Sequence, residues 1–143
     1  EDLPQDALNF VSANSTLSIG RLVLHLAYSE LSQVRNFSKI EVPADLQEAL
    51  SDGTLKAFER PPASSPPAST LHELCEQVWN EVTVPFLKSV EDIDRTRLPD
   101  GSTLEAILMH LIWHWIYHSG HIGLIRLEWG SDYEWVLKRP VVN

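Results

Sequence analysis

Histidines are the residues of this chain whose number and spacing point most directly to chemistry. Four of the six lie in one apolar stretch, at His110, His114, His118 and His121. A helix advances about 100° per residue, so these four side chains would share a stripe about 80° wide. Bulky apolar residues flank the stripe, namely Leu111, Trp115, Ile122 and Ile125. We therefore expect the stripe to face the interior, where imidazoles cost free energy unless they are paired.

A single metal ion could satisfy several of these histidines at once. Neutral imidazole is the commonest protein ligand for Zn, Ni or Fe. The spacing His114-x-x-x-His118 places two rings one turn apart on the same face, as a chelating pair requires. A third ligand must come from another helix, and His25 is the candidate because it lies mid-helix among apolar positions. Imidazole suits several divalent ions, so these residues do not name the metal.

Each histidine also has a purely structural interpretation. A lone core histidine such as His25 is more often hydrogen-bonded to a carbonyl, and His110 is by default structural at the edge of the core. His72 and Cys75 are spaced like a ligand pair, but they lie near an expected helix start, and we expect both on the surface. The sequence has neither the H-E-x-x-H zinc-protease motif nor the E-x-x-H pairs of a di-iron bundle.

Capping patterns delimit the two helices that carry these candidate ligands. Ser102 and Glu105 form a capping box, and Gly130 can adopt the left-handed conformation that ends a helix. The histidine helix is therefore predicted between them. Ser18 is the expected N-cap of a helix over residues 19–36, where apolar residues recur at helical spacing.

The middle of the chain combines a proline-rich connection with a third long helix. Arg60–Thr70 is expected to be a non-helical, mobile crossover loop. Thr70 and Glu73 form a second capping box, and the helix it opens must be kinked or ended by Pro85. Two short helices are expected, one at Pro4–Asn9 and one over residues 44–50 that ends at Asp52-Gly53. No β alternation is evident, so the predicted fold is an all-α bundle.

Composition describes one acidic domain covering residues 1–143, with 43% hydrophobic and 22% charged residues. The formal net charge is −9, and the 11 basic residues form no cluster, which argues against nucleic acid as a partner. Cys75 is the single cysteine, so an internal disulfide is excluded and a reducing cytoplasm is expected. No stretch has the length and apolarity of a membrane span, and we expect no membrane partner.

Two segments resemble the DinB-like (YfiT-like) proteins. The run His114-Trp115-Ile116-Tyr117-His118-Ser119-Gly120-His121-Ile122 is similar to the family signature H-x-x-x-H-x-G-Q-I. Asn14–Gly20 and His25–Glu30 are similar to an earlier family segment, in which a serine-initiated helix carries the first metal histidine. The order of elements agrees over nearly the whole chain.

The resemblance implies a four-helix bundle with a long crossover loop, one divalent metal ion and usually a homodimer. Carried over by position, the metal ligands would be His25, His114 and His118. His121 stands where the family often has glutamine, so it would be a partner of a ligand, an extra ligand or a proton carrier. The family's usual first helix would precede residue 1, so we expect either that the sequence is truncated or that the lead-in or a partner chain covers that face.

The resemblance also implies a function. Members of the family include metal-dependent hydrolases and S-transferases that use a low-molecular-weight thiol. We accordingly expect a metal-dependent enzyme that activates a thiol or water, with Tyr28 and Glu30 as further candidates beside His121. The alternative is a non-catalytic metal-binding or dimeric binding module with a role in stress responses.

Overall fold

The computed structural model describes residues 3–13, 16–38, 40–54, 56, 59, 64–93, 95–98 and 101–131. Every element in those ranges is helical, apart from isolated bridges that join Val11 to Ser18 and Arg97 to Thr103. The all-α prediction is therefore confirmed. In chain order the elements are α1 (Gln5–Asn9), α2 (Ile19–Phe37), α3 (Ala44–Ala49), the 3-10 turn η1 (Ser51–Gly53), α4 (Ala68–Gln77), the π-helix η3 (Val78–Thr83), α5 (Val84–Ser89) and α6 (Leu104–Trp129).

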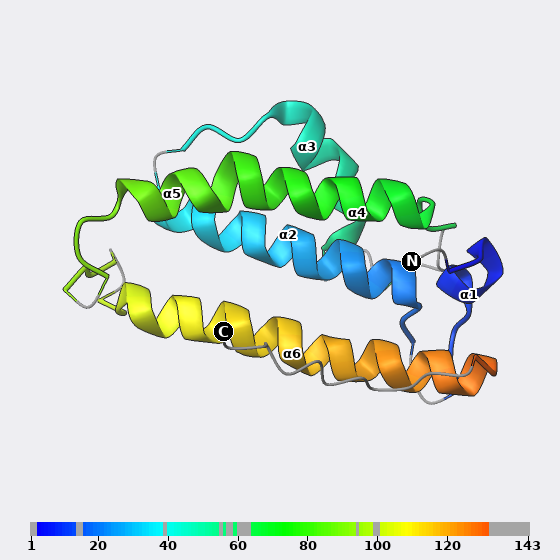
Figure 1. Cartoon of the computed structure of the whole chain (residues 1–143). Helices are drawn as coiled ribbons and strands as arrows, with labels where there is room; N and C mark the ends of the chain where they lie inside the picture. The colour runs from blue at the N-terminus through cyan, green and yellow to red at the C-terminus, as the bar shows by residue number, and fades with distance from the viewer. Residues whose placement is uncertain are drawn as a thin grey trace, which may run out of the picture.

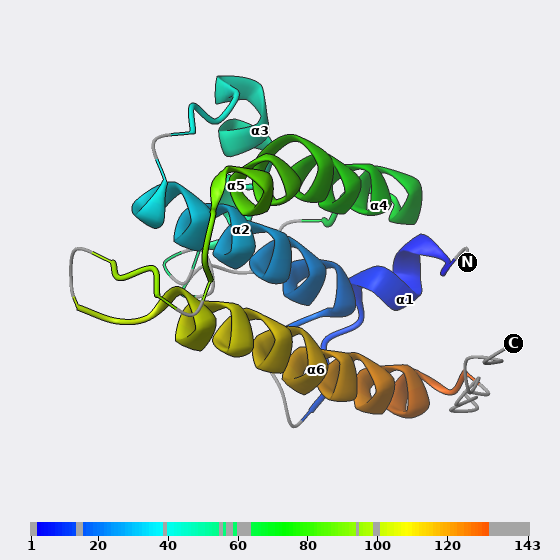
Figure 2. The ribbon, with the colours of Figure 1, turned by 60° about the vertical axis from the view of Figure 1, so that its left-hand side comes forward.

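Helix α2 is the centre of this arrangement. In both ribbon views it runs between the α4–η3–α5 segment on one side and α6 on the other (Figures 1 and 2). It also packs against α1 and η1. Its start is the predicted one, because the Ser18 hydroxyl accepts a hydrogen bond from the Arg21 amide and so satisfies a first-turn donor.

Helix α6 begins later than the capping box at Ser102 predicts. Its N-cap is Thr103, whose hydroxyl accepts a hydrogen bond from the Ala106 amide. Ser102 lies in the preceding turn, where its carbonyl accepts from the Leu98 amide. That loop hydrogen bond explains why Thr103, and not Ser102, caps the helix. The end is as predicted, since Gly130 caps the helix with a φ of 94°.

The third long helix begins earlier than predicted. Helix α4 starts at Ala68, with Pro67 as N-cap, so Thr70 lies inside its first turn and does not cap it. The predicted loop Arg60–Thr70 is thus wrong for its last three residues. Residues 64–67 are non-helical, whereas residues 60–63 and their predicted mobility lie outside the described residues.

Pro85 does not end this helix. The six residues before Val84 are π-helical, and helical structure then continues through α5 with Pro85 in its first turn. Proline has no amide hydrogen and its ring crowds the preceding turn, so widening that turn is one way to keep the segment helical. Thr83, the last residue of the π-helix, donates a hydrogen bond to Glu30 of α2.

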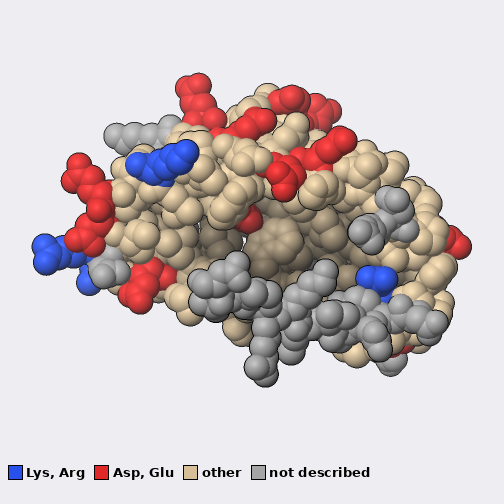
Figure 3. All heavy atoms as spheres, in the orientation of Figure 1, with Lys and Arg blue, Asp and Glu red and all other residues tan. Residues whose placement is uncertain are grey.

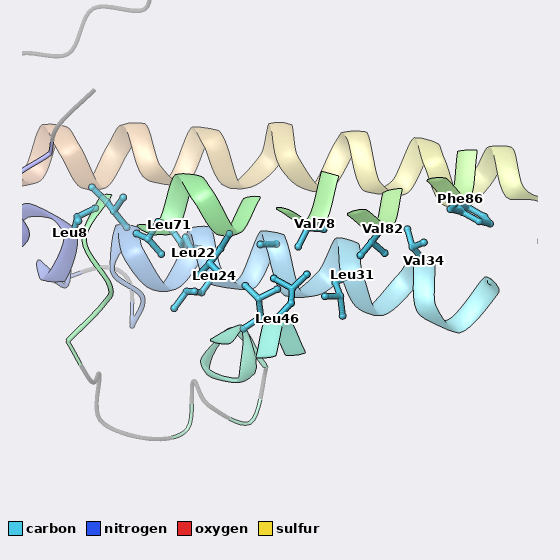
Figure 4. Close-up of a cluster of buried hydrophobic side chains, with 14 of the residues drawn as sticks. Leu8, Leu22, Leu24, Leu31, Val34, Leu46, Leu71, Val78, Val82 and Phe86 are labelled. Carbon is cyan, nitrogen blue, oxygen red and sulfur yellow. The ribbon is translucent and has the colours of Figure 1, made fainter. Parts of the chain in front are cut away.

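The hydrophobic core lies mainly between α2 and the α4–η3–α5 segment. Helix α2 contributes Leu22, Leu24, Leu31 and Val34 to this cluster, and the α4–η3–α5 segment contributes Leu71, Val78, Val82 and Phe86 (Figure 4). Leu8 and Leu46 extend the cluster. Helix α6 supplies fewer residues, chiefly Leu104 and Ile125. The contact between α2 and α6 is therefore less dominated by aliphatic side chains.

Helix α6 has an apolar outer surface. Residues 106–125 contain no Asp, Glu, Lys or Arg. Several large side chains are exposed along the helix, namely Met109, Ile112, Trp113, Ile116, Tyr117, Leu124 and Leu127. Even so, within the described ranges no helix has both the length and the apolarity to cross a membrane.

Candidate metal centre

The three histidines that the sequence singled out come together between α2 and α6. His25 of α2 and His114 and His118 of α6 each offer one potential ligand atom, and these atoms lie within 4.8 Å of one another. The three rings are nearly perpendicular in pairs, with centroids 4.6 to 5.3 Å apart. They therefore converge edge to face and do not stack.

His25 is fixed by a backbone carbonyl. Its Nδ1 lies 3.0 Å from the carbonyl oxygen of Gly53 in η1. A carbonyl can only accept, so Nδ1 carries the proton and the lone pair of the neutral ring is on Nε2. A structural histidine in the core would form the same hydrogen bond to a carbonyl. Histidines that bind metal ions are also commonly oriented by such a bond.

A glycine is what allows this carbonyl to approach. A Cβ atom at Gly53 would overlap the Leu24 carbonyl oxygen and also crowd the Tyr28 Cβ. The turn η1 can therefore lie against α2 only because residue 53 has no side chain. Sequence reasoning missed this role, because Gly53 was interpreted only as the end of a short helix.

His118 and His121 contact each other through their Nδ1 atoms, which are 3.2 Å apart. One of these nitrogens must donate and the other accept. His118 is buried and His121 is partly buried, so the pair lies at the edge of the cluster. His110 is exposed and stacks nearly parallel on His114, with centroids 5.9 Å apart. The predicted inward stripe thus turns outward at His110.

The cluster favours neutral imidazoles. Burial, followed by the neighbouring His114, His25 and His121, lowers the pKa of His118 to about 4. Burial, followed by His25 and His110, also lowers the pKa of His114 from its usual value. Both rings are therefore unprotonated at neutral pH, which is the state that binds metal ions.

One polar atom in the cluster has no partner. The Nδ1 of His114 is buried without a hydrogen bond in the described structure. A buried polar atom without a partner costs free energy. Coordination of a metal ion, together with the neighbouring neutral imidazoles, would satisfy this nitrogen. The residues present therefore fit a divalent metal ion, and the three histidines could hold one.

A small pocket lined by residues with polar side chains opens beside His25. It has a volume of about 220 Å³ and is lined by His25, Tyr28, Ser29, Ser32 and Gln33. The Gln33 side-chain oxygen is buried with no hydrogen-bond partner among the described residues. This pocket gives a small polar molecule access to the same side of α2 as the histidine cluster.

Glu30 lies on a different flank of α2. It is five residues from His25, which corresponds to about 140° around the helix. One carboxylate oxygen accepts from the Thr83 hydroxyl at 2.6 Å, and the other accepts from the Trp115 indole at 2.9 Å. Glu30 is 8% exposed, so this is a buried carboxylate joining three helical segments.

The expectation that His72 and Cys75 both lie on the surface is correct only for the histidine. His72 is exposed, whereas Cys75 is partly buried. Burial, followed by the charges of Glu30 and Glu76, raises the pKa of the Cys75 thiol to about 11. Neither residue belongs to the described cluster that could hold a metal ion.

Comparison with known proteins adds one finding to this geometry. The model of a family described as the DinB family matches residues 1–136, which is nearly the whole chain. Neither the comparison with curated proteins nor that with solved structures found a match.

Proposed function

We propose that this protein, which belongs to the DinB family, binds one divalent metal ion through His25, His114 and His118. The observation that carries the proposal is that three potential ligand atoms from two helices lie within 4.8 Å of one another. The unpartnered Nδ1 of His114 supports it. When bound, the ion would lower the pKa of a thiol or a water molecule toward neutrality.

The neighbours of the ligands would set their orientation. Gly53 holds the proton of His25 on Nδ1 and leaves Nε2 available. If His118 likewise uses Nε2 as its ligand atom, its Nδ1 donates to Nδ1 of His121. His121 then carries its own proton on Nε2 and has no free lone pair. Of the three roles considered for His121, we therefore propose that of a positioning residue.

The proposed activity is that of a thiol S-transferase or a hydrolase. The 220 Å³ pocket beside His25 supports a small substrate, because its hydroxyl and amide groups can form hydrogen bonds. Tyr28, Ser29 and Gln33 would bind and orient the polar part of that substrate. The alternative is a metal-binding protein without catalytic activity, and the second experiment below separates the two.

The first experiment measures metal content in tag-free protein that has never been exposed to a nickel column. We expect about one equivalent of a single divalent metal in the wild type and none in His118→Ala, because two imidazoles bind far more weakly than three. His72→Ala removes an exposed histidine outside the cluster and should retain the metal. Full occupancy in His118→Ala would refute the ligand assignment.

The second experiment asks whether the metal-loaded protein is an enzyme. A small thiol is mixed with 1-chloro-2,4-dinitrobenzene to detect S-transfer, and 4-nitrophenyl acetate is used to detect hydrolysis. An enzyme should accelerate one reaction in the wild type and in His72→Ala but not in His118→Ala. A metal-loaded protein that accelerates neither would favour the non-catalytic alternative.

We also propose that two copies of the chain associate through the exposed apolar face of α6. The exposed residues recur along a helix of 26 residues, which is about 39 Å long. Positions 106–125 have no Asp, Glu, Lys or Arg, so contact at this face would not bury a side chain of these types. A two-fold interface uses the same patch twice, so one apolar helix face is sufficient.

Sedimentation equilibrium tests this association. We expect a dimer for the wild type and a monomer for Ile116→Glu, because Ile116 is 66% exposed on α6 and a carboxylate there would be buried against its copy. Ile93→Glu makes the same change at an exposed residue outside α6 and should remain dimeric. A monomeric wild type would contradict the proposal.

A further inference from the structure

A second cavity lies apart from the histidine cluster. It has a volume of about 490 Å³ and is enclosed by α2, the α4–η3–α5 segment and α6. Figure 3 shows the hollow between the α4–η3–α5 segment and α6, with acidic atoms visible inside it. A volume of this size is within the range of small-molecule sites.

The walls of this cavity are apolar. They are formed by Trp79, Leu87, Leu108, Leu111, Ile112 and Trp115. Two of these are tryptophans, which contact flat or aliphatic ligands over a large area. The cavity shares no lining residue with the pocket beside His25, so the two openings are separate.

The charge of the cavity is negative. Glu30 lines it from α2 and Glu76 from α4, and its described lining contains no Lys, Arg or His. Thr83 and Trp115 donate hydrogen bonds to Glu30, but both are neutral. A carboxylate has about four acceptor positions, so these two donors leave acceptor capacity unused.

A buried charge without an opposite charge is costly, and proteins usually pair it. In the described part of the chain, Glu30 has two neutral hydrogen-bond donors and no ion-pair partner. Cys75 also lines the cavity, and its pKa is raised first by burial and then by the charges of Glu30 and Glu76, which agrees with a negative potential there. A cationic group bound in the cavity would balance this charge.

We propose that this cavity binds a small organic cation, namely a protonated amine carried on an apolar or aromatic body. The ammonium group would donate to Glu30, and the body would pack against Trp79, Trp115 and the leucines. Tryptophan faces also attract cations, which adds to the preference. Anionic ligands would be excluded by Glu30 and Glu76. The site is independent of the histidine cluster and does not require a metal ion.

Isothermal titration calorimetry with three probes of similar shape tests the proposal. These are 2-phenylethylamine, 2-phenylethanol and 3-phenylpropionate, each titrated into the full chain in phosphate buffer at pH 7. We expect the amine to bind about tenfold or more tightly than the alcohol, because hydrogen bonds to charged groups are stronger. The carboxylate should not bind measurably. Equal binding of amine and alcohol, or no binding of any probe, would overturn the proposal.

Two charge variants locate the binding. Glu30→Gln keeps the shape of the side chain but removes its charge. It should therefore abolish the preference for the amine and leave the affinity for the alcohol unchanged within about twofold. Glu76→Lys places a positive charge at the cavity wall and should weaken binding of the amine by about two- to fivefold. Glu73→Lys makes the same charge change on α4 outside the cavity and should have almost no effect. If Glu30→Gln does not fold, the two lysine variants still decide the question.

Removing bound metal with a chelator distinguishes binding in this cavity from binding at the histidine cluster. We expect the amine to bind equally well before and after treatment with a chelator. Binding that is lost with the metal would mean that the amine coordinates the metal ion, and the cavity proposal would be wrong. A protein that binds no metal but still prefers the amine would contradict the proposed function alone.

Discussion

The two sides of α2 are built from different residues and do different work. One side is aliphatic, with Leu24, Leu31 and Val34 in the core cluster. The side toward α6 includes two titratable residues, His25 and Glu30, and both are more than nine-tenths buried. Buried polar residues are costly, so we infer that the aliphatic side contributes mainly to stability, whereas the side toward α6 is the one suited to binding.

The largest expected effect tests the aliphatic side. Leu31→Ala should lower the free energy of unfolding by about 2–5 kcal/mol, because Leu31 is 1% exposed and its removal leaves a cavity. Chemical denaturation measures this loss. Metal content per folded molecule should stay at the wild-type value, and a loss of metal in the folded protein would show that the two sides are coupled.

A glycine at the junction should affect both sides. Gly53→Ala forces η1 away from the Leu24 carbonyl, so we expect a destabilisation of about 1–3 kcal/mol. The same shift moves the carbonyl that orients His25 and should weaken metal binding. Denaturation and metal titration would be measured together. Gly101→Ala is not a suitable control because of its positive φ. Gly120→Ala has open space and lies inside α6, so it should leave stability unchanged or raise it by up to about 1 kcal/mol.

A smaller effect is expected at the edge of the histidine cluster. His121→Ala removes the partner of His118 and should reduce metal affinity by about 10–100-fold. His121→Gln restores a hydrogen-bonding side chain and should recover much of that affinity. Competition with a chromophoric chelator measures both. Stability without metal should change little, since His121 is only partly buried.

The smallest effect concerns the reactivity of Cys75. With a pKa of about 11 in place of 9.0, its thiolate fraction at pH 8 is about 100-fold below that of an ordinary cysteine. Alkylation by iodoacetamide should therefore be slow and should accelerate as the pH rises toward 11. Glu30→Gln removes one of the charges that raise this pKa and should speed the reaction at pH 8. An unchanged rate would mean that Glu30 does not set the potential of the cavity.

The sequence could predict what depends on local pattern. The N-cap at Ser18 and the left-handed cap at Gly130 are local features, and both were predicted. The convergence of His25 with His114 and His118 followed from helical spacing and family resemblance. Whether these residues ligate a metal stays a prediction.

The rest depends on contacts between distant residues. The choice of Thr103 over Ser102 as the α6 cap rests on a hydrogen bond from Leu98. The hydrogen bond from Thr83 to Glu30 joins positions 53 residues apart and depends on a π-helix that no sequence pattern predicted. Neither could be inferred from periodicity, because periodicity describes one helix at a time.

The carbonyl of Gly53 also has a consequence for local motion. It ties the turn that follows α3 to a histidine of the central helix. A ligand that binds only the ordered arrangement slows the local opening of the segments that hold it. Bound metal would therefore slow hydrogen exchange at the amides of Gly53 and Thr54, which donate within the turn to Leu50 and Ser51. A short turn outside the histidine cluster would then report on an ion held between two helices.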